Sequence, residues 1–178
     1  SPCVGFFVLL KTEEENAIDK LKQTLKAIQD QTYGMPRYVV VINDKVEYNE
    51  EIYNILASSF DFKQTEYHMV QLEHKPQTEW HKLDPAFIHA KNGWIYVTSS
   101  GEDVDKDIIL KIHKRINIDM KKLVVVQPYK NINGMIFQAA LFKFLNGNKT
   151  KLYQDEIVDS RSFLEKVESA AKNSGEDT

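Results

Sequence analysis

The sequence has a single cysteine, Cys3, among its 178 residues, so no disulfide can form within the chain. Its cysteine content therefore gives no reason to require an oxidising compartment. The five histidines show neither HExxH spacing nor a paired CxxC partner, which argues against a structural zinc site. The GxGxxG, GxxxxGK[ST] and GxSxG patterns are also missing, so the common dinucleotide, P-loop and hydrolase sites lack their defining residues.

The chain also lacks a strong excess of charge of one sign and a long apolar run. Its formal net charge is −3, which gives no electrostatic reason to expect nucleic acid or an anionic membrane as a partner. The early apolar run Val4–Leu10 is too short to span a bilayer and has no basic leader before it. We therefore expect a cytoplasmic protein without an integral membrane segment. The first residue is Ser1 rather than Met, so the sequence leaves open whether a further segment lies upstream.

The length and ordinary composition, with 42% hydrophobic and 28% charged residues, predict one domain with a single core over residues 3–172 and a flexible tail over 173–178. Val4–Leu10 is typical of a buried strand. Thr12 and Glu15 have the spacing of a capping box, and apolar residues at helical spacing follow. Tyr38–Ile42 is a second buried strand. Strand, helix and strand in this order predict a parallel βαβ unit.

The rest of the chain continues the alternation of helices and strands. We expect an edge strand over Glu66–Leu72, a polar loop over Glu73–Lys82, and a helix that starts at Asp84-Pro85 and runs toward Lys91. The other expected elements are helices over Asn49–Phe60, Met135–Leu145 and Ser160–Ala171, and a buried strand over Leu123–Gln127. The order predicts an α/β fold with a mainly parallel sheet, a single three-layer α/β/α domain.

The stretch Asn92–Ile112 is the best candidate for a functional segment. Trp94–Thr98 is aromatic and β-branched, as strands prefer, and Ser99–Asp103 forms a polar elbow in which Gly101 frees the backbone. A helix is expected after the elbow, with its buried stripe formed by Val104, Ile108, Ile109, Ile112 and Ile116. Ligands of open α/β sheets bind beyond the carboxyl ends of strands, and the elbow would lie there.

Several local patterns resemble those of GT-A-type nucleotide-sugar transferases, specifically the family-two glycosyltransferases. FVLLKTEEENAIDKLKQTLKAIQDQTY is similar to the opening strand, acidic turn and helix of that family, and YVVVINDK stands where its second strand ends in an acidic cluster. HAKNGWIYVTSSGEDVDKDII occupies the place of the strand with the Asp-x-Asp motif. GMIFQAALFKFLNG resembles the acceptor-side helix, and LYQDEIVDSRSF resembles the motif that supplies a catalytic base.

This resemblance implies a domain that binds a nucleotide-sugar donor, a UDP- or GDP-sugar, and transfers the sugar to a hydroxyl acceptor with inversion. It implies that Thr12, Asp44 and Ser100 contact the nucleotide. Glu102 and Asp103 would hold Mg²⁺ or Mn²⁺ beside the diphosphate, and Asp155 would take the proton of the acceptor.

The sequence also departs from the family pattern, and the departures keep an alternative open. Asn43 replaces the first aspartate of the nucleotide-binding pair, Lys45 stands where glycine is usual, and Ser100-Gly101-Glu102 replaces Asp-x-Asp. A neutral hydroxyl is a poorer ligand for a hard cation than a carboxylate. The competing hypothesis is a GT-A-like binding or assembly module without catalysis.

Each candidate residue also has an explanation that needs no ligand. Glu102, Asp103 and Asp105 would be favourable at a helix start, where acidic side chains stabilise the helix dipole. Asp44 is also typical of a turn after a strand, and Asp155 with Glu156 of a solvated helix start. Of the two tryptophans, Trp80 lies in the expected polar loop and is the better candidate to stack on a sugar or base.

Overall fold

The computed structural model describes residues 3–72, 78–116, 124–126, 131–139, 161–163 and 165–166. Its centre is a six-stranded sheet with the strand order β3-β2-β1-β4-β6-β5. The strands are β1 (Val4–Leu9), β2 (Tyr38–Asn43), β3 (Glu66–Gln71), β4 (Trp94–Ser99), β5 (Val124–Val126) and β6 (Ile136–Gln138). β3, β2, β1 and β4 are mutually parallel, whereas β6 runs antiparallel to both β4 and β5. The α/β fold with a mainly parallel sheet is confirmed.

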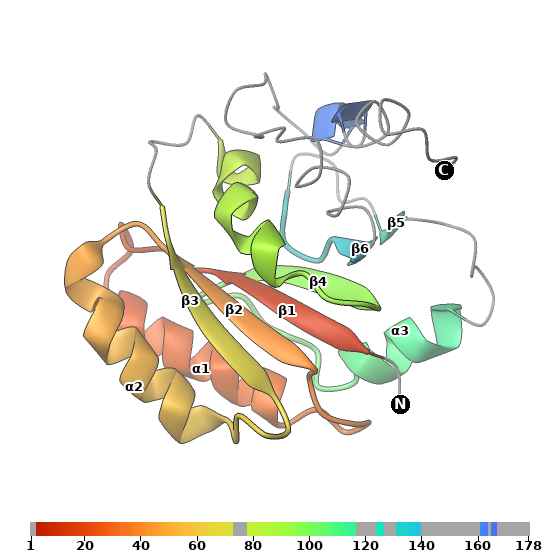
Figure 1. The fold of residues 1–178 in the computed structure, drawn as a ribbon, viewed down its shortest axis with the longest axis horizontal. Coiled ribbons are helices and arrows are strands. Elements are labelled where there is room, and N and C mark those ends of the chain that lie inside the picture. Colours follow the sequence, from red (N-terminus) through yellow and green to blue (C-terminus); the bar gives the residue numbers. More distant parts are fainter. Residues whose placement is uncertain are drawn as a thin grey trace.

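Three α-helices cover one face of the sheet, as Figure 1 shows for α1 and α2 beneath β1–β3. They are α1 (Ala17–Gln29), α2 (Asn49–Ser59) and α3 (Ile108–Ile116), and the short 3₁₀ helix η1 (Val46–Tyr48) precedes α2. Leucine and isoleucine side chains of the α-helices pack on Phe6 and Val8 of β1 and on Val39 and Val41 of β2. Because side chains alternate along a strand, the neighbouring residues of β1 and β2 face the opposite layer.

That opposite layer is built around η2, a 3₁₀ helix over Glu79–His89 that lies on the other side of the sheet in Figure 1. Its buried Trp80, Leu83 and Ala86 follow one another at intervals of three residues. A 3₁₀ helix has three residues per turn, so this spacing places all three side chains on one face. They pack with Phe7 and Tyr38 from the strands.

The structure corrects the expected boundaries around η2. The helix begins at Glu79, inside the expected loop Glu73–Lys82, and ends at His89 rather than Lys91. Trp80 is 3% exposed and packs against Phe163 with ring centroids 5.5 Å apart. Trp80 is therefore a core residue, and the hypothesis that it stacks on a sugar or base is wrong.

The expected helix Met135–Leu145 is wrong in its described part, because Ile136–Gln138 form strand β6. Ile95 pairs with Phe137 and Tyr96 pairs with Ile136 across the β4–β6 ladder. A short apolar run is compatible with either a buried helix or a buried strand. The open edge of β4 decides between them, because its backbone groups require partners.

Two helix starts also differ from expectation. α1 begins at Ala17 after Asn16, which has a left-handed φ of 58° and no side-chain capping bond. The Thr12–Glu15 capping box is therefore absent, and Thr12 is hydrogen-bonded elsewhere. α3 begins only at Ile108, so Val104 precedes the helix, although it is buried in the same core.

The other expected elements in the described range are confirmed to within a few residues, including β3 at the sheet edge. Residues 161–163 and 165–166 are helical, within the helix expected from Ser160 to Ala171. The tail over 173–178 lies outside the described residues. None of the helices in the described ranges is both long and apolar enough to cross a bilayer.

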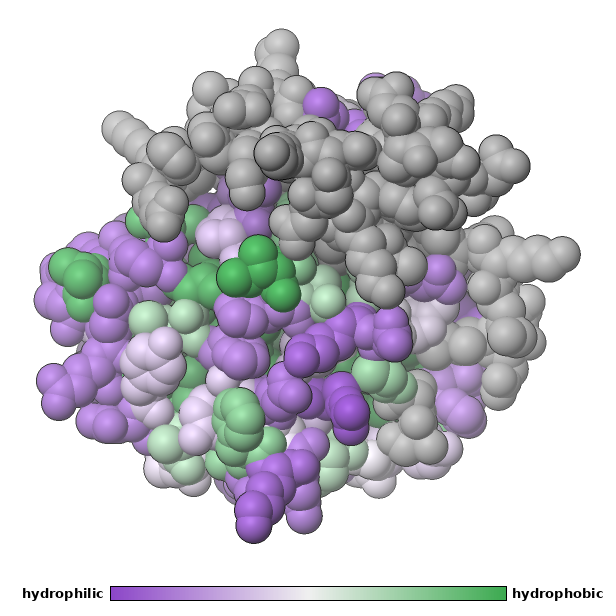
Figure 2. Space-filling model, viewed as in Figure 1, coloured by the Kyte–Doolittle hydropathy of each residue, from purple (hydrophilic) through white to green (hydrophobic). Residues whose placement is uncertain are grey.

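The described part of the surface in Figure 2 is mainly hydrophilic, and its apolar patches are small and separated. The large apolar side chains that are exposed come from different elements: Met35, Val46, Tyr53, Phe62 and Ile88. Scattered exposed apolar residues are normal for a globular protein. We therefore look for function at the two ends of the parallel strands.

Candidate functional site

The carboxyl ends of β1, β2 and β4 bring the predicted nucleotide-binding residues to one edge of the sheet. β1 lies between β2 and β4, and all three strands point the same way. The segments that follow them, Lys11–Thr12, Asn43–Asp44 and Ser100–Asp103, therefore leave the sheet side by side. We call this edge the carboxyl rim, and it is the position where open α/β sheets bind ligands.

Thr12 and Asp44 are in direct contact at the carboxyl rim. The Thr12 hydroxyl donates a hydrogen bond of 2.5 Å to Oδ1 of Asp44. Thr12 is 6% exposed, whereas Asp44 is exposed. A carboxylate has two oxygens and several lone pairs, so Asp44 retains acceptor capacity toward a ligand while Thr12 fixes its orientation.

Asn43 organises the turn that presents Asp44. Its buried amide donates to the carbonyl of Lys45 and to Oδ1 of Asn49, both at 2.7 Å, and its oxygen accepts from the Lys45 amide at 3.0 Å. Only an amide side chain can donate two bonds and accept one here, because a carboxylate cannot donate. The departure from the family pattern at Asn43 therefore has a local structural reason.

The elbow after β4 is fixed to the segment after β1 by polar contacts. Ser100 is 3% exposed, and its hydroxyl accepts a 2.8 Å hydrogen bond from the Lys11 amide. The Gly101 amide donates to the Thr24 hydroxyl of α1 at 3.1 Å. Gly101 has a φ of 88°, a conformation that side-chain-bearing residues rarely adopt. Ser100 thus lies at the predicted place, and its oxygen already serves the protein backbone.

Glu102 and Asp103, the last two residues of the elbow, are exposed. They precede α3 by several residues, and the first turn of α3 contains no acidic residue. Stabilisation of a helix dipole therefore does not explain Glu102 or Asp103. It does not apply to Asp105 either, whose carboxylate accepts from the Asp107 amide at 2.8 Å and pairs with Lys111. The Lys111 ammonium lowers the pKa of Asp105, and the Asp105 carboxylate is engaged in contacts within the protein.

The described residues include no group of three histidine, cysteine or acidic side chains that would hold a metal ion by themselves. Mg²⁺ beside a phosphate is usually bound by only one or two carboxylates together with water and phosphate oxygens. Glu102 and Asp103 supply hard anionic oxygens that are open to solvent. This donor set fits an ion that arrives with a diphosphate, and it does not fit a metal site that fills without one.

Lys11 is a rim residue that the sequence analysis missed. Its side chain is 14% exposed and pairs with Glu79 at the start of η2. Burial lowers the pKa of Lys11, and the charge of Lys82 lowers it further, while Glu13, Glu14 and Glu102 act in the opposite direction. A lysine immediately after a buried strand was the signal available in the sequence.

The proposed base Asp155 lies outside the described residues. Of the histidines, His81 is 2% exposed and its Nδ1 lies 2.9 Å from the Thr78 hydroxyl. His68 and His89 stack with ring centroids 4.0 Å apart. These contacts give the three histidines structural surroundings within η2 and β3.

No protein-family model and no curated protein matches the sequence. Solved structures of TarS from S. aureus do match in fold. The structure of TarS residues 1–349 with UDP has a TM-score of 0.55 at 14% identity over 83% of this chain and 49% of TarS. The complex with UDP-GlcNAc gives 0.56 at 14% identity over 83% and 47%, and TarS 1–349 alone gives 0.57 at 11% over 94% and 55%.

This chain spans about half the length of the TarS 1–349 chains that it matches. At such low identity the likeness concerns the fold alone. It shows that the α/β fold predicted from the sequence is shared with TarS.

Proposed function

We propose that this chain is a GT-A-like domain of the family-two type that binds a nucleotide-sugar donor at the carboxyl rim. The observation that carries the proposal is the convergence of Thr12, Asp44 and the Ser100–Glu102 elbow at one edge of the sheet. The fold shared with TarS, which was solved with UDP and UDP-GlcNAc, supports a UDP-sugar, and a GDP-sugar is the other candidate.

In this proposal Asp44 accepts hydrogen bonds from the ribose or base, and Thr12 holds the carboxylate in position. Ser100 belongs to the same rim and keeps the elbow against the segment after β1. Glu102 and Asp103 hold Mg²⁺ or Mn²⁺ together with the diphosphate. That ion would neutralise the leaving nucleoside diphosphate. The described part of the rim carries several carboxylates, so a diphosphate needs a cation to approach it.

The proposed reaction is a single displacement at the anomeric carbon of the sugar. The acceptor oxygen attacks, the bond from the anomeric carbon to the diphosphate oxygen breaks, and the configuration inverts. Asp155 takes the proton of the acceptor hydroxyl.

The binding proposal is tested by thermal unfolding with UDP or GDP, with Mn²⁺, and with nucleotide and Mn²⁺ together. We expect a rise only with nucleotide and metal together, because the rim lacks a complete metal site of its own. At roughly 100 times the Kd, binding adds about 2.7 kcal/mol, which corresponds to roughly 5–10 °C for a domain of this size. A flat response to every combination would refute the nucleotide-sugar proposal.

Glu102→Gln separates the role of the metal from that of the nucleotide. It removes one negative charge without changing the size of the side chain, so the metal-dependent rise should disappear. Glu51→Gln on the exposed face of α2 makes the same change away from the rim. This control variant should still show the metal-dependent rise in melting temperature. An unchanged response in Glu102→Gln would remove that residue from the metal site.

The second candidate function is a binding module without catalysis. It is favoured by the commitment of Asn43 and Ser100 to contacts within the protein. An assay of donor hydrolysis distinguishes the two functions. The binding module would bind nucleotide and metal but release no sugar from the donor. Asp155→Asn would then give the same result as the unmodified chain.

A further inference from the structure

The amino ends of the parallel strands form a second site, on the edge opposite the carboxyl rim. An open hollow of about 450 Å³ lies there, within the size range of small-molecule sites. Its walls come from the short segments before four strands. They contain Cys3 before β1, Met35–Arg37 before β2, Gln64 before β3, and Lys91 with Asn92 before β4. We call it the amino-edge hollow.

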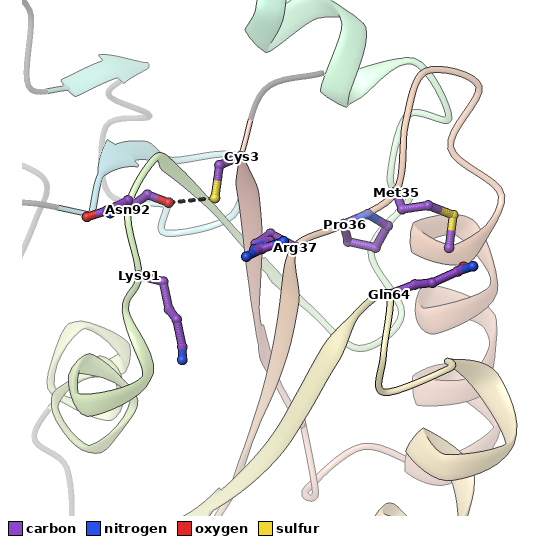
Figure 3. Close-up of a pocket in the computed structure, with 7 residues that line it drawn as sticks. All are labelled: Cys3, Met35, Pro36, Arg37, Gln64, Lys91 and Asn92. Atoms are coloured by element: carbon purple, nitrogen blue, oxygen red, sulfur yellow. Dashed lines mark hydrogen bonds between the residues drawn. The ribbon is translucent and has the colours of Figure 1, made fainter.

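The lining of the amino-edge hollow is cationic. Among the lining residues that the structure describes, Arg37 and Lys91 are charged and none is acidic. In Figure 3, Arg37 lies between Lys91 and Asn92 on one side and Pro36 on the other. Lys91 pairs with Glu66 at 3.2 Å. No ion pair joins Arg37 to any carboxylate in the described ranges, so its guanidinium is the uncompensated charge of the hollow.

The backbone holds these residues in place before any ligand arrives. The Arg37 backbone amide donates a hydrogen bond to the carbonyl of Val4 at 2.7 Å. The Arg37 carbonyl accepts one from the backbone amide of Glu66 at 3.2 Å. The Lys91 amide donates to the hydroxyl of Tyr38 at 3.2 Å. Because the backbone of these residues is already held in place, less backbone conformational entropy is lost when a ligand binds.

The wall around Cys3 is also closely packed. Gly93 has a φ of 102°, and a Cβ there would overlap the Cys3 carbonyl. The Cys3 thiol donates to the Asn92 carbonyl at 2.6 Å. Burial raises the pKa of Cys3, although Arg37 acts against it. The raised pKa makes the thiol less reactive than that of a free cysteine, and the thiol lines the wall of the hollow.

From these observations we propose that the amino-edge hollow binds a small organic anion through Arg37 and Lys91. The guanidinium presents paired N–H donors that match a carboxylate or a phosphate. The hollow, at about 450 Å³, has room for an organic molecule that carries the anionic group. This site is independent of nucleotide-sugar binding.

The experiment uses Cys3 as a local reporter, because it is the chain's only cysteine. Alkylation by the uncharged reagent N-ethylmaleimide is followed by mass spectrometry, with citrate as the carboxylate probe and pyrophosphate as the phosphate probe. Sodium chloride at matched ionic strength is the control. We expect at least one anion to slow alkylation and to raise the melting temperature. The effective probe identifies the preferred chemistry.

Arg37→Gln and Lys91→Gln test the two cations. Both side chains are exposed, so the variants should fold. The concentration of anion needed for half-protection should rise at least about tenfold in Arg37→Gln, as expected for loss of a charged hydrogen-bonding partner. The matched variants Arg115→Gln on α3 and Lys22→Gln on α1 remove exposed charges elsewhere and should behave as the unmodified chain does.

Two results would overturn the proposal. One is that neither anion slows alkylation beyond the salt control. The other is that protection is the same in Arg37→Gln and Lys91→Gln as in the matched variants. A melting-temperature rise with pyrophosphate that leaves Cys3 alkylation unchanged reports binding elsewhere, such as the carboxyl rim, and counts against the hollow.

Discussion

At the scale of single residues, Asn43 shows how a departure from a family pattern acquires a structural role. Its amide makes three hydrogen bonds within the turn that presents Asp44. The geometry of the proposed nucleotide site therefore depends on a side chain that does not itself reach the ligand.

The first prediction is that Asn43→Asp destabilises the protein by about 1–3 kcal/mol, because two partly buried acceptors lose their donors and a carboxylate takes the fully buried place of the amide. A carboxylate would also face the oxygen of Asn49. The free energy of unfolding is measured by urea denaturation at pH 7. Asn54→Asp on the exposed face of α2 is the control and should change it little. Equal stability of Asn43→Asp and the parent chain would show that the turn does not need the amide.

At the scale of elements, η2 is the least expected feature of the fold. The sequence predicts a polar loop through Lys82, yet Trp80, Leu83, Ala86 and Phe87 form much of the core above the sheet. The three-residue spacing of Trp80, Leu83 and Ala86 is that of a 3₁₀ helix, and a search for α-helical or strand periodicity does not detect the first part of this helix. The polar residues between them give the segment the composition of a loop.

The second prediction compares two positions on η2. Leu83 is 0% exposed and Ile88 is 69% exposed. Leu83→Ala should lower the free energy of unfolding by about 2–5 kcal/mol through lost burial and a cavity. Ile88→Ala removes a similar side-chain volume at an exposed position. It should change the free energy of unfolding by less than about 0.5 kcal/mol. Chemical denaturation measures both, and similar losses in the two variants would contradict the packing described for η2.

At the scale of the whole molecule, the histidine stack joins the edge strand β3 to the end of η2. His68 and His89 are nearly parallel, with 13° between the ring planes. Burial lowers the pKa of His89, and the charges of His68 and Lys91 lower it further, while Glu66 opposes them. Protonation of both rings would place two cations face to face.

The third prediction concerns stability against pH. Because the pKa of His89 is lower in the folded chain than in the unfolded chain, the unfolded state binds more protons as pH falls. Stability from this group is complete above the unfolded pKa of about 6.5 and is lost as pH falls through it toward the folded value. Melting temperatures from pH 8 to pH 5 measure this loss. His89→Gln should flatten the decline relative to His113→Gln on α3, and parallel curves would exclude the stack as the cause.

Much of the fold was predictable because strong local signals agree with it. The apolar runs at Val4–Leu9, Tyr38–Asn43 and Trp94–Ser99 are short, β-rich and bounded by polar residues, and such runs become parallel strands when both faces are covered. The placement of Thr12, Asp44, Ser100 and Glu102 at one rim followed from the direction of those strands.

The remaining features needed long-range contacts. Ile136–Gln138 form a strand because they pair with the edge of β4. Thr12 does not cap a helix because its hydroxyl donates to Asp44, which lies beside it in the folded chain. Lys11 and Arg37 look like ordinary surface cations in the sequence, and only the sheet brings each into a site.

The sequence by itself determined the α/β alternation, the parallel core and the edge at which polar residues gather, because hydrophobic periodicity and strand polarity are local properties. The tertiary structure alone decided which polar groups are already committed to partners and which stay open to a ligand. It also created the hollow at the opposite edge, since that hollow is formed by residues before four different strands and no single segment contains it.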